Sequence, residues 1–308
     1  MVRNYIAFAT FLLAQANAFA VVSAPCPIQR AAAAGPNVWL LCERKDLLVS
    51  ADDGKTWQSK QLPTDERLRA IAFPDVRRGF VAGDGGTLLS TVDGGGTWRA
   101  VALSSKENLT SVFFLGDLGW LGGWNGLILH STDGGKTWAP QRSGVLQGID
   151  SIYFADANHG WAVGWIGSIL RTADGGQKWE VVKTNAASWS LSAVYFRDLN
   201  HGWAVGFNGQ ILHSKDGGVT WQQQPSASQA WLTSVVFDSL GRGWIAAESR
   251  MLLSQDGGET WKPMPLDGAL VLNQLLVTRD SVWVIGQSGV LRQTGKDPVF
   301  SALQIATG

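Results

Sequence analysis

One short motif recurs six times along this chain of 308 residues, at intervals of 40 to 42 residues. Each copy has a Ser or Thr, an Asp two residues later, a Gly two residues after that, and a Trp three residues further on. The six aspartates that mark the copies are Asp52, Asp93, Asp133, Asp174, Asp216 and Asp256. Repetition at a fixed period means that one supersecondary unit is used several times, and about 40 residues is the length of a four-stranded propeller blade. The period therefore predicts an all-β repeat protein.

The third repeat shows how one unit is expected to fold. Residues 109–114 form an apolar run with β-branched and aromatic residues, which is typical of an inner strand. A second strand over 120–123 and a third over 127–130 flank Asn125-Gly126, a dipeptide that suits a tight hairpin turn with positive φ. The motif then forms the exit turn of the third strand, and its Trp opens a fourth strand.

Second and third strands on this template occur as seven pairs, and the last pair, at 282–286 and 289–292, lacks the motif. Seven pairs predict a seven-bladed β-propeller of four-stranded antiparallel blades, in a single domain over 25–308. Residues 28–34 are expected to supply the inner strand of the first blade. Residues 299–305 are expected to supply the outer strand of the last blade.

The motif itself has a structural explanation. A carboxylate can accept N–H bonds within its own turn, glycines permit positive φ, and a Trp buries a large flat face between neighbouring strands. We therefore interpret the six aspartates as turn-forming residues rather than catalytic acids. In the fourth copy, Lys178 stands where the other copies have Thr.

The first residues differ in character from the repeats. Arg3 precedes an apolar run over 5–13, and small residues follow as far as Ala24. This is the pattern of a secretory signal peptide, and the run is too short for a membrane span. We expect residues 1–20 to be a signal peptide, cleaved near 18–24, and the protein to be exported to the periplasm, or to the thylakoid lumen in a photosynthetic host. No later stretch is apolar enough to cross a bilayer.

The chain has two cysteines, Cys26 and Cys42, which lie 16 residues apart on what would be neighbouring strands of the first blade. In an exported protein such a pair is a candidate disulfide. Closing a loop of this size would stabilise the fold by about 3 kcal/mol. We expect this bond to hold the N-terminal blade in the ring.

Charge is balanced, with 25 basic and 25 acidic residues. Such a chain has no general electrostatic attraction to nucleic acid or to anionic lipid. The unusual feature of the composition is aromatic: 16 tryptophans stand against three tyrosines, and six of the tryptophans belong to the motifs.

The motif matches the pattern called the Asp-box, or BNR repeat. The longer pattern that precedes it, Gly-Trp-Ala-Val-Gly-x-x-Gly-x-Ile-Leu, is more specific to one family. From about Val38 to Arg292 the chain resembles the photosystem II stability and assembly factor family of seven-bladed propellers. The resemblance implies a non-catalytic, protein-binding scaffold or assembly factor for a membrane protein complex, active in photosynthesis in some members. It also implies a basic binding patch, and Arg67 and Arg69 lie where such a patch would be.

Two other classes of function share this fold: glycan-binding propellers and sialidase-like glycoside hydrolases. Tryptophan platforms suit the first class. For the second, hydrolysis needs two opposed carboxylates about 5–10 Å apart. The chain has no Arg-Ile-Pro segment, and Tyr153 and Tyr195 share a repeat position with Phe113 and Val236, which indicates packing. His130 and His213 stand on separate blades, and no cluster has metal-ligand spacing. We therefore expect no enzyme activity, no metal and no cofactor.

The turns between second and third strands lie on one rim of a propeller, together with the links between blades, whereas the Asp-boxes lie on the other side. Blades three to five place a large aromatic residue in this turn, where other blades place a polar one. A run of aromatics at hairpin tips is either a packed cap or a contact surface. Our hypothesis is a one-sided docking patch for a protein partner with a polar rim of arginines, formed by Trp124, Trp165, Phe207, Trp189, Trp231, Arg67, Arg69 and Arg142.

Overall fold

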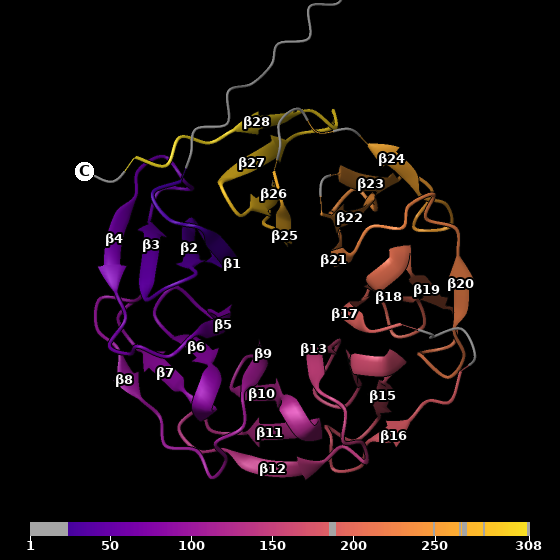
Figure 1. The fold of residues 1–308 in the computed structure, drawn as a ribbon, viewed down its shortest axis with the longest axis horizontal. Coiled ribbons are helices and arrows are strands. Elements are labelled where there is room, and N and C mark those ends of the chain that lie inside the picture. Colours follow the sequence, from indigo (N-terminus) through magenta and orange to yellow (C-terminus); the bar gives the residue numbers. More distant parts are fainter. Residues whose placement is uncertain are drawn as a thin grey trace, which may run out of the picture.

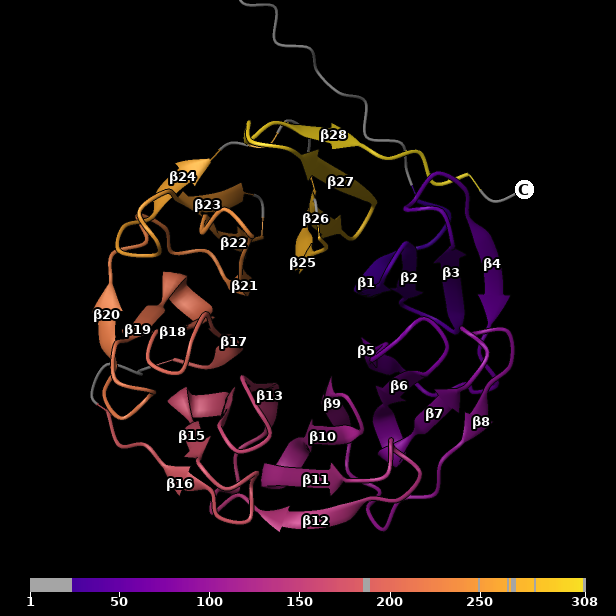
Figure 2. The same ribbon diagram turned by 180° about the vertical axis from the view of Figure 1, so that it is seen from behind.

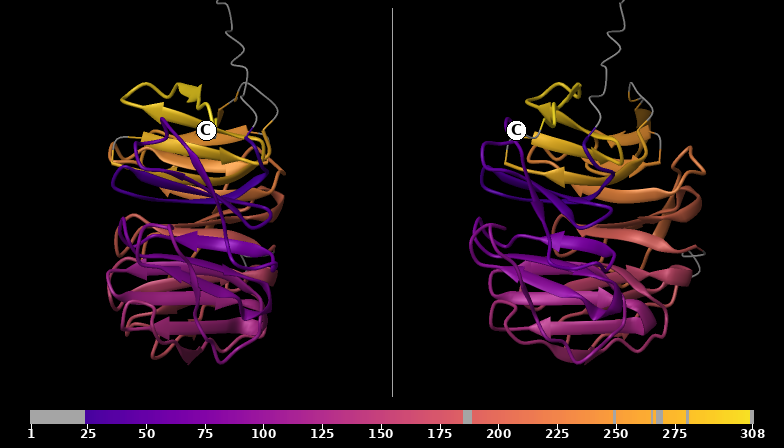
Figure 3. Two further views of the ribbon diagram at one scale, coloured as in Figure 1. Left: turned by 90° about the vertical axis from the view of Figure 1, so that its left-hand side faces the viewer. Right: turned by 60° about the vertical axis from the view of Figure 1, so that its left-hand side comes forward.

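Seven four-stranded sheets stand around a central axis in the computed structural model of this protein, which describes residues 24–184, 189–248, 250–264, 266, 270–279 and 281–306. Figures 1 and 2 show the ring from its two faces, and Figure 3 shows it edge-on, with the strand connections forming the two faces. Neighbouring strands in each sheet are antiparallel and follow chain order from the centre outward. The predicted all-β, seven-bladed propeller is confirmed.

The blades occupy successive segments of the chain. The first four are β1 to β4 (Ile28–Ala34, Asn37–Cys42, Asp46–Ser50, Gln58–Gln61), β5 to β8 (Leu68–Ala72, Gly79–Gly83, Leu88–Thr91, Arg99–Ala100), β9 to β12 (Leu109–Leu115, Leu118–Gly123, Leu127–Ser131, Ala139–Arg142) and β13 to β16 (Ile149–Phe154, Gly160–Gly164, Ile169–Thr172, Glu180–Val181). The last three are β17 to β20 (Leu191–Phe196, Gly202–Gly206, Ile211–Ser214, Gln222–Gln224), β21 to β24 (Leu232–Phe237, Gly243–Ala247, Arg250–Ser254, Lys262–Met264) and β25 to β28 (Leu272–Val277, Ser281–Gly286, Gly289–Thr294, Phe300–Ala302). Four one-turn 3-10 helices, η1 (Asp84–Gly86), η2 (Trp124–Gly126), η3 (Trp165–Gly167) and η4 (Phe207–Gly209), join second to third strands in blades two to five.

No strand is exchanged between the first and last blades. Residues 28–34 form the inner strand β1, as predicted, and the predicted outer strand within 299–305 is β28 (Phe300–Ala302). The ring is therefore closed by contacts between the faces of blades seven and one, and not by a shared sheet.

Each Asp-box is a hydrogen-bonded turn, as the second copy shows. Asp93 Oδ1 accepts the backbone N–H of Thr97 at 2.8 Å and the hydroxyl of Thr91 at 2.7 Å, while Oδ2 accepts the Thr97 hydroxyl at 2.7 Å. The Thr91 hydroxyl in turn accepts the buried N–H of Gly95 at 3.0 Å. These bonds, led by the one from the Thr97 backbone, hold the pKa of Asp93 well below its usual range. The carboxylate is engaged by its own turn, which is a structural role.

A repeated aromatic contact joins most neighbouring blades. The second-strand aromatic residue of one blade packs against a Phe at the end of the next blade's inner strand, with ring centroids 3.5 to 4.4 Å apart. The rings are stacked in the pairs Trp39–Phe73, Phe80–Phe114, Trp120–Phe154 and Trp161–Phe196, and tilted in Trp203–Phe237. The tryptophans among these also donate their indole N–H to a carbonyl of the next blade's Asp-box, as Trp161 does to Gly217 at 2.9 Å. The box and the inner strand therefore form one interlocking unit across each of these junctions.

The two junctions that flank the seventh blade are built differently. Val277 and Ala33 occupy the positions of the stacking Phe, and blade seven has no Asp-box. Trp283, fully buried, faces the first box but its indole nitrogen has no hydrogen-bond partner among the described residues. Arg292 crosses this junction instead and bonds the carbonyl and carboxylate of Asp53.

The N-terminal segment of the described chain ties blade one to blade seven. Cys26 and Cys42 form a disulfide, with Cα atoms 5.9 Å apart. On either side of Cys26, the N–H groups of Ala24 and Ile28 donate to the carbonyls of Ser288 and Gln287 in the last blade, at 2.8 and 2.9 Å. The disulfide thus holds a strap that crosses the junction between blades one and seven.

Residues 1–20, where a signal peptide is expected, lie outside the described part of the chain, together with most of the predicted cleavage region. Within the described ranges, no helix has the length and apolar character needed to cross a bilayer.

Candidate binding site

A β-bulge at the start of every inner strand places one polar residue at the same position in all seven blades. The register with the second strand shifts immediately after the first residue, so the next residue has no partner in the ladder. These bulge residues are Gln29, Arg69, Thr110, Asp150, Ser192, Thr233 and Asn273. The start of each inner strand pairs with the end of the second strand, which leads into η1 to η4 in blades two to five, so these residues lie toward that face of the ring.

Some bulge residues connect the blades. Thr233 Oγ1 donates to the carbonyl of Leu272 at 3.2 Å and Asn273 Nδ2 to that of Ile28 at 2.6 Å, each reaching the first inner-strand residue of the next blade. Thr110 makes the equivalent bond to Ile149. Arg69, Asp150 and Ser192 have other partners, and these three line the candidate site together with Thr110.

The aromatic residues of the third, fourth and fifth blades reach the channel mouth because of their turns. Trp124, Trp165 and Phe207 are the first residues of η2, η3 and η4, and each is followed by a residue with φ of 55° or 56°. Their N–H groups donate to the carbonyls of Asn108, Gly148 and Ser190, just before the inner strand of the same blade, at 2.9 to 3.0 Å. These bonds fix the turns over the inner strands, and so hold the rings beside the channel.

The structure brings all five predicted aromatic residues and Arg69 to a single hollow of about 600 Å³, here called the aromatic pocket, which is lined by Trp124, Trp165, Trp189, Phe207, Trp231, Arg30, Arg69, Thr110, Asp150, Ser190 and Ser192. Ring centroids of successive aromatics are 5.5 Å apart for Trp124–Trp165, 5.7 Å for Trp189–Phe207 and 6.5 Å for Phe207–Trp231. Four of the rings are between 39% and 49% exposed. They form an open arc over the third to sixth blades rather than a closed cap.

Three charged residues, Arg30, Arg69 and Asp150, also line the aromatic pocket. Arg69 lies 5.8 Å from the ring of Trp124 and forms a bidentate pair with Asp84 of η1, with Nη2 to Oδ2 at 2.9 Å. Asp150 belongs to β13, which lies across the channel from β1, the strand that carries Arg30 (Figure 1). Burial raises the pKa of Asp150 to about 6, although the Trp165 side chain and the charges of Arg30 and Arg69 act in the other direction.

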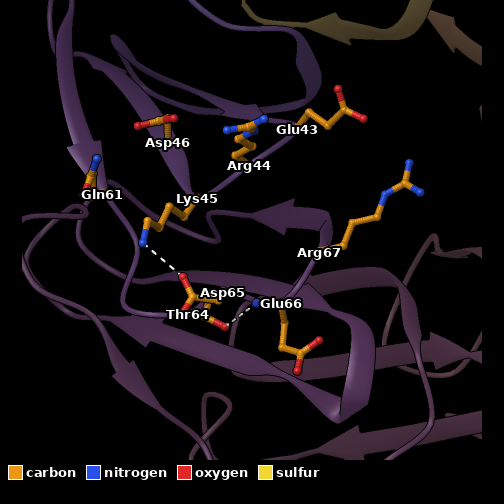
Figure 4. Close-up of a pocket in the computed structure, with 9 residues that line it drawn as sticks. All are labelled: Glu43, Arg44, Lys45, Asp46, Gln61, Thr64, Asp65, Glu66 and Arg67. Atoms are coloured by element: carbon orange, nitrogen blue, oxygen red, sulfur yellow. Dashed lines mark hydrogen bonds and ion pairs between the residues drawn. The ribbon is translucent and has the colours of Figure 1, made fainter.

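Arg67 and Arg142, which were predicted as part of the polar rim, do not line the aromatic pocket. Arg67 precedes β5 and points into a separate cleft beside Glu66, Asp65 and the β2–β3 hairpin (Figure 4). Arg142 is exposed on β12, the outermost strand of the third blade, where it pairs in register with Leu127. An outer strand is separated from the channel by the rest of its blade.

The sequence analysis missed Arg30, Thr110, Asp150, Ser190 and Ser192. A signal for three of these was present, because Thr110, Asp150 and Ser192 stand at the same repeat position as Arg69, directly after the first apolar residue of each inner strand. Arg30 follows its own bulge residue by one position. Only the bulge geometry shows that these residues face the channel.

Replacing Asp150 with Asn is expected to stabilise the protein at neutral pH by about 1 to 3 kcal/mol. The raised pKa means that the folded protein binds this proton more strongly than the unfolded chain does. The wild type therefore loses stability as the pH rises from about 4 to about 6. An amide does not ionise, so the variant avoids that loss. Urea unfolding of both proteins across this pH range checks the prediction, and a variant less stable than the wild type at neutral pH would contradict it.

The carboxylates and histidines of the described residues bear on enzyme and metal chemistry. Asp150 is the single carboxylate among the described residues that line the aromatic pocket. Across the described ranges, no group of three or more His, Cys, Asp and Glu side chains is arranged to hold a metal ion. His130 and His213 stack on Trp120 and Trp203, and burial lowers the pKa of both.

Comparisons with known proteins agree with the fold and identify the family. A solved structure described as "YCF48 bound to D1 peptide" is 21% identical in sequence to this chain, with a TM-score of 0.75 over 92% of this chain and 96% of that chain. A second, described as "YCF48 from Cyanidioschyzon merolae", is 20% identical, with a TM-score of 0.75 over 92% of this chain and 100% of that chain. A glycoside hydrolase of Niastella koreensis, 13% identical with a TM-score of 0.72 over 92% of this chain and 55% of that chain, shares the fold. No curated protein matches. The family model described as "Photosynthesis system II assembly factor YCF48" matches residues 49–144 and 181–296, more than half of the sequence. The chain therefore belongs to this family of photosystem II assembly factors.

Proposed function

We propose that the protein is an exported, non-catalytic assembly factor that binds a segment of a membrane protein complex in the aromatic pocket. The observation that carries the proposal is the arc of partly exposed aromatic rings on one face of the ring, beside a charged channel mouth. Exposed aromatic clusters of this kind mark protein contact surfaces, because Trp side chains contribute large amounts of binding energy.

The family assignment supports a role in assembly, and one similar solved structure is described as having a D1 peptide bound. The Cys26–Cys42 disulfide supports export, since such bonds persist in oxidising compartments. The single pocket carboxylate, among the described lining residues, supports a binding rather than a hydrolytic role, because glycoside hydrolysis uses two.

Replacing Trp124, Trp165 and Phe207 together with Ala is expected to weaken partner capture by at least about tenfold, because hot-spot aromatics each contribute strongly to binding. The tagged protein would be incubated with detergent-solubilised membranes of its source organism, and captured subunits would be quantified by mass spectrometry. The expected result is capture of subunits of one membrane protein complex by the wild type and their loss from the triple variant.

A matched control uses the opposite face. Val92, Val219 and Leu240 are exposed apolar residues in or near the box-side turns, and their joint replacement with Ala should leave capture unchanged. Thermal melting of both variants shows whether the ring remains folded. Equal capture by the wild type and a folded aromatic variant would refute the proposed site.

A further inference from the structure

The charges of the aromatic pocket are unequally compensated. Arg69 is neutralised by its bidentate pair with Asp84. Arg30, by contrast, makes no ion pair with any described residue, and its guanidinium donates only to the adjacent carbonyl of Gln29, at 2.9 Å. The remaining charged lining residue is Asp150, which also forms no ion pair within the described chain. The pocket thus contains one cation and one acid that share a cavity without binding each other.

The charges of Arg30 and Asp150 do not cancel at every pH. An arginine side chain stays protonated at all ordinary pH values, whereas a carboxyl group whose pKa is raised to about 6 is partly neutral near pH 6. A cationic ligand group would meet Arg30 as a like charge. An anionic group would meet a guanidinium that has free N–H donors and that prefers carboxylate geometry. Charge complementarity therefore favours an anion.

The positions of the rings and of the arginines also determine the order in which apolar and charged groups would follow one another along a bound segment. The aromatic arc covers the third to sixth blades, whereas Arg30 lies on β1 and Arg69 on β5, on the other side of the channel mouth (Figures 1 and 2). A segment that crosses the mouth would place apolar side chains on the rings and, further along, a polar group beside Arg30.

We propose that the aromatic pocket selects a partner segment in which an acidic side chain lies beside apolar or aromatic residues, with Arg30 binding the carboxylate and Asp150 competing for Arg30. This inference rests on the proposed function and specifies the chemistry of the partner at the same site. Protonation of Asp150 removes the competitor, so binding strengthens as the pH falls from about 7 to about 5. Three further acids lie on or beside the turns at the pocket: Asp84 pairs with Arg69, Glu66 lies beside Gly85 of η1, and Glu107 accepts a hydrogen bond from Asn125 of η2. No histidine stands among the described residues that line the pocket.

The probes are three peptides of about seven residues, capped at both ends so that no terminal charge contributes. Each has one central residue, Glu, Gln or Lys, flanked on both sides by Leu and Phe. Isothermal titration of the full protein at about pH 5 should show the Glu peptide binding at least about tenfold more tightly than the Gln peptide, with the Lys peptide weakest.

Two variants test the residue assignments. Arg30→Gln should remove the preference for Glu over Gln, whereas the matched control Arg142→Gln, which changes an exposed arginine outside the pocket, should keep it. For the wild type, affinity for the Glu peptide should fall about tenfold from pH 5 to pH 7, because a group with a pKa near 6 changes from mostly protonated to mostly ionised over this range. Asp150→Asn should bind at pH 7 as the wild type does at pH 5.

Failure of this inference can be distinguished from failure of the proposed function. If the three peptides bind equally, or if a folded Arg30→Gln variant keeps the Glu preference, the inference is wrong. Weak binding of the Gln peptide that disappears in the Trp124, Trp165 and Phe207 triple variant would still support the aromatic pocket as the docking site. If no peptide binds, or if the triple variant binds all three as well as the wild type does, both fail.

Discussion

Replacing Trp161 with Ala is expected to lower the free energy of unfolding by about 3 to 5 kcal/mol. This side chain is 2% exposed, and its ring stacks on Phe196 of the next blade with centroids 3.5 Å apart and planes at 9°. Its removal leaves a cavity between the fourth and fifth blades and leaves the carbonyl of Gly217 without its indole donor. Urea unfolding followed by circular dichroism measures the loss, and a loss below about 1 kcal/mol would contradict this description of the junction.

A comparison of two Trp→Phe variants separates the hydrogen bond from the packing. Trp161→Phe keeps an aromatic ring but loses the bond to Gly217, so it should cost about 1 to 2 kcal/mol. Trp283→Phe should cost less, because the indole nitrogen of Trp283 is buried without a partner among the described residues. If the two variants lost the same stability, the indole bond to the box would have no measurable role.

Removing the disulfide by replacing Cys26 and Cys42 together with Ala is expected to destabilise the protein by about 3 kcal/mol. The bond closes a loop with a sequence separation of 16. It also holds the strap that donates to Ser288 and Gln287 across the junction of blades seven and one, where Ala33 stands at the position of the stacking Phe. Chemical unfolding with and without a reducing agent provides the measurement.

The reductant serves as an internal control for this prediction. Reduced wild type should match the double variant, and the double variant itself should not respond to the reductant. Hydrogen exchange should quicken first at the amides of Ala24, Ile28 and Glu43, which bond across or beside the strap. An unchanged unfolding midpoint after complete reduction would show that the other contacts of Arg292 and Asn273 close the ring on their own.

Much of the fold was predictable because the repeat carries its own turn chemistry. The Asp-box fixes the exit of the third strand, and the Asn-Gly and related pairs fix the hairpins, so blade number and strand order follow from counting copies. The aromatic side of the site was also predictable, because topology alone assigns hairpin tips and interblade links to one face. Trp124, Trp165 and Phe207 occupy the same turn in successive blades, and the structure places them together.

The charged side of the site depends on geometry that spacing does not reveal. Arg69 and Arg67 differ by two residues, yet the bulge after Leu68 turns Arg69 toward Asp84 and the channel, while Arg67 stays on the link and faces another cleft. Arg30 and Asp150 are more than 100 positions apart and meet only because closure of the ring brings the first and fourth blades to opposite sides of one channel. Long-range pairing of this kind has no local pattern.

The absence of strand exchange between the first and last blades makes each interblade link topologically equivalent to the gap between the chain ends. Circular permutants with the native ends joined can therefore begin at any link without cutting a sheet. In such a permutant the first blade, with its Cys26–Cys42 disulfide, becomes an internal segment, and the order in which the blades are synthesised changes. The residues that form the aromatic pocket stay the same.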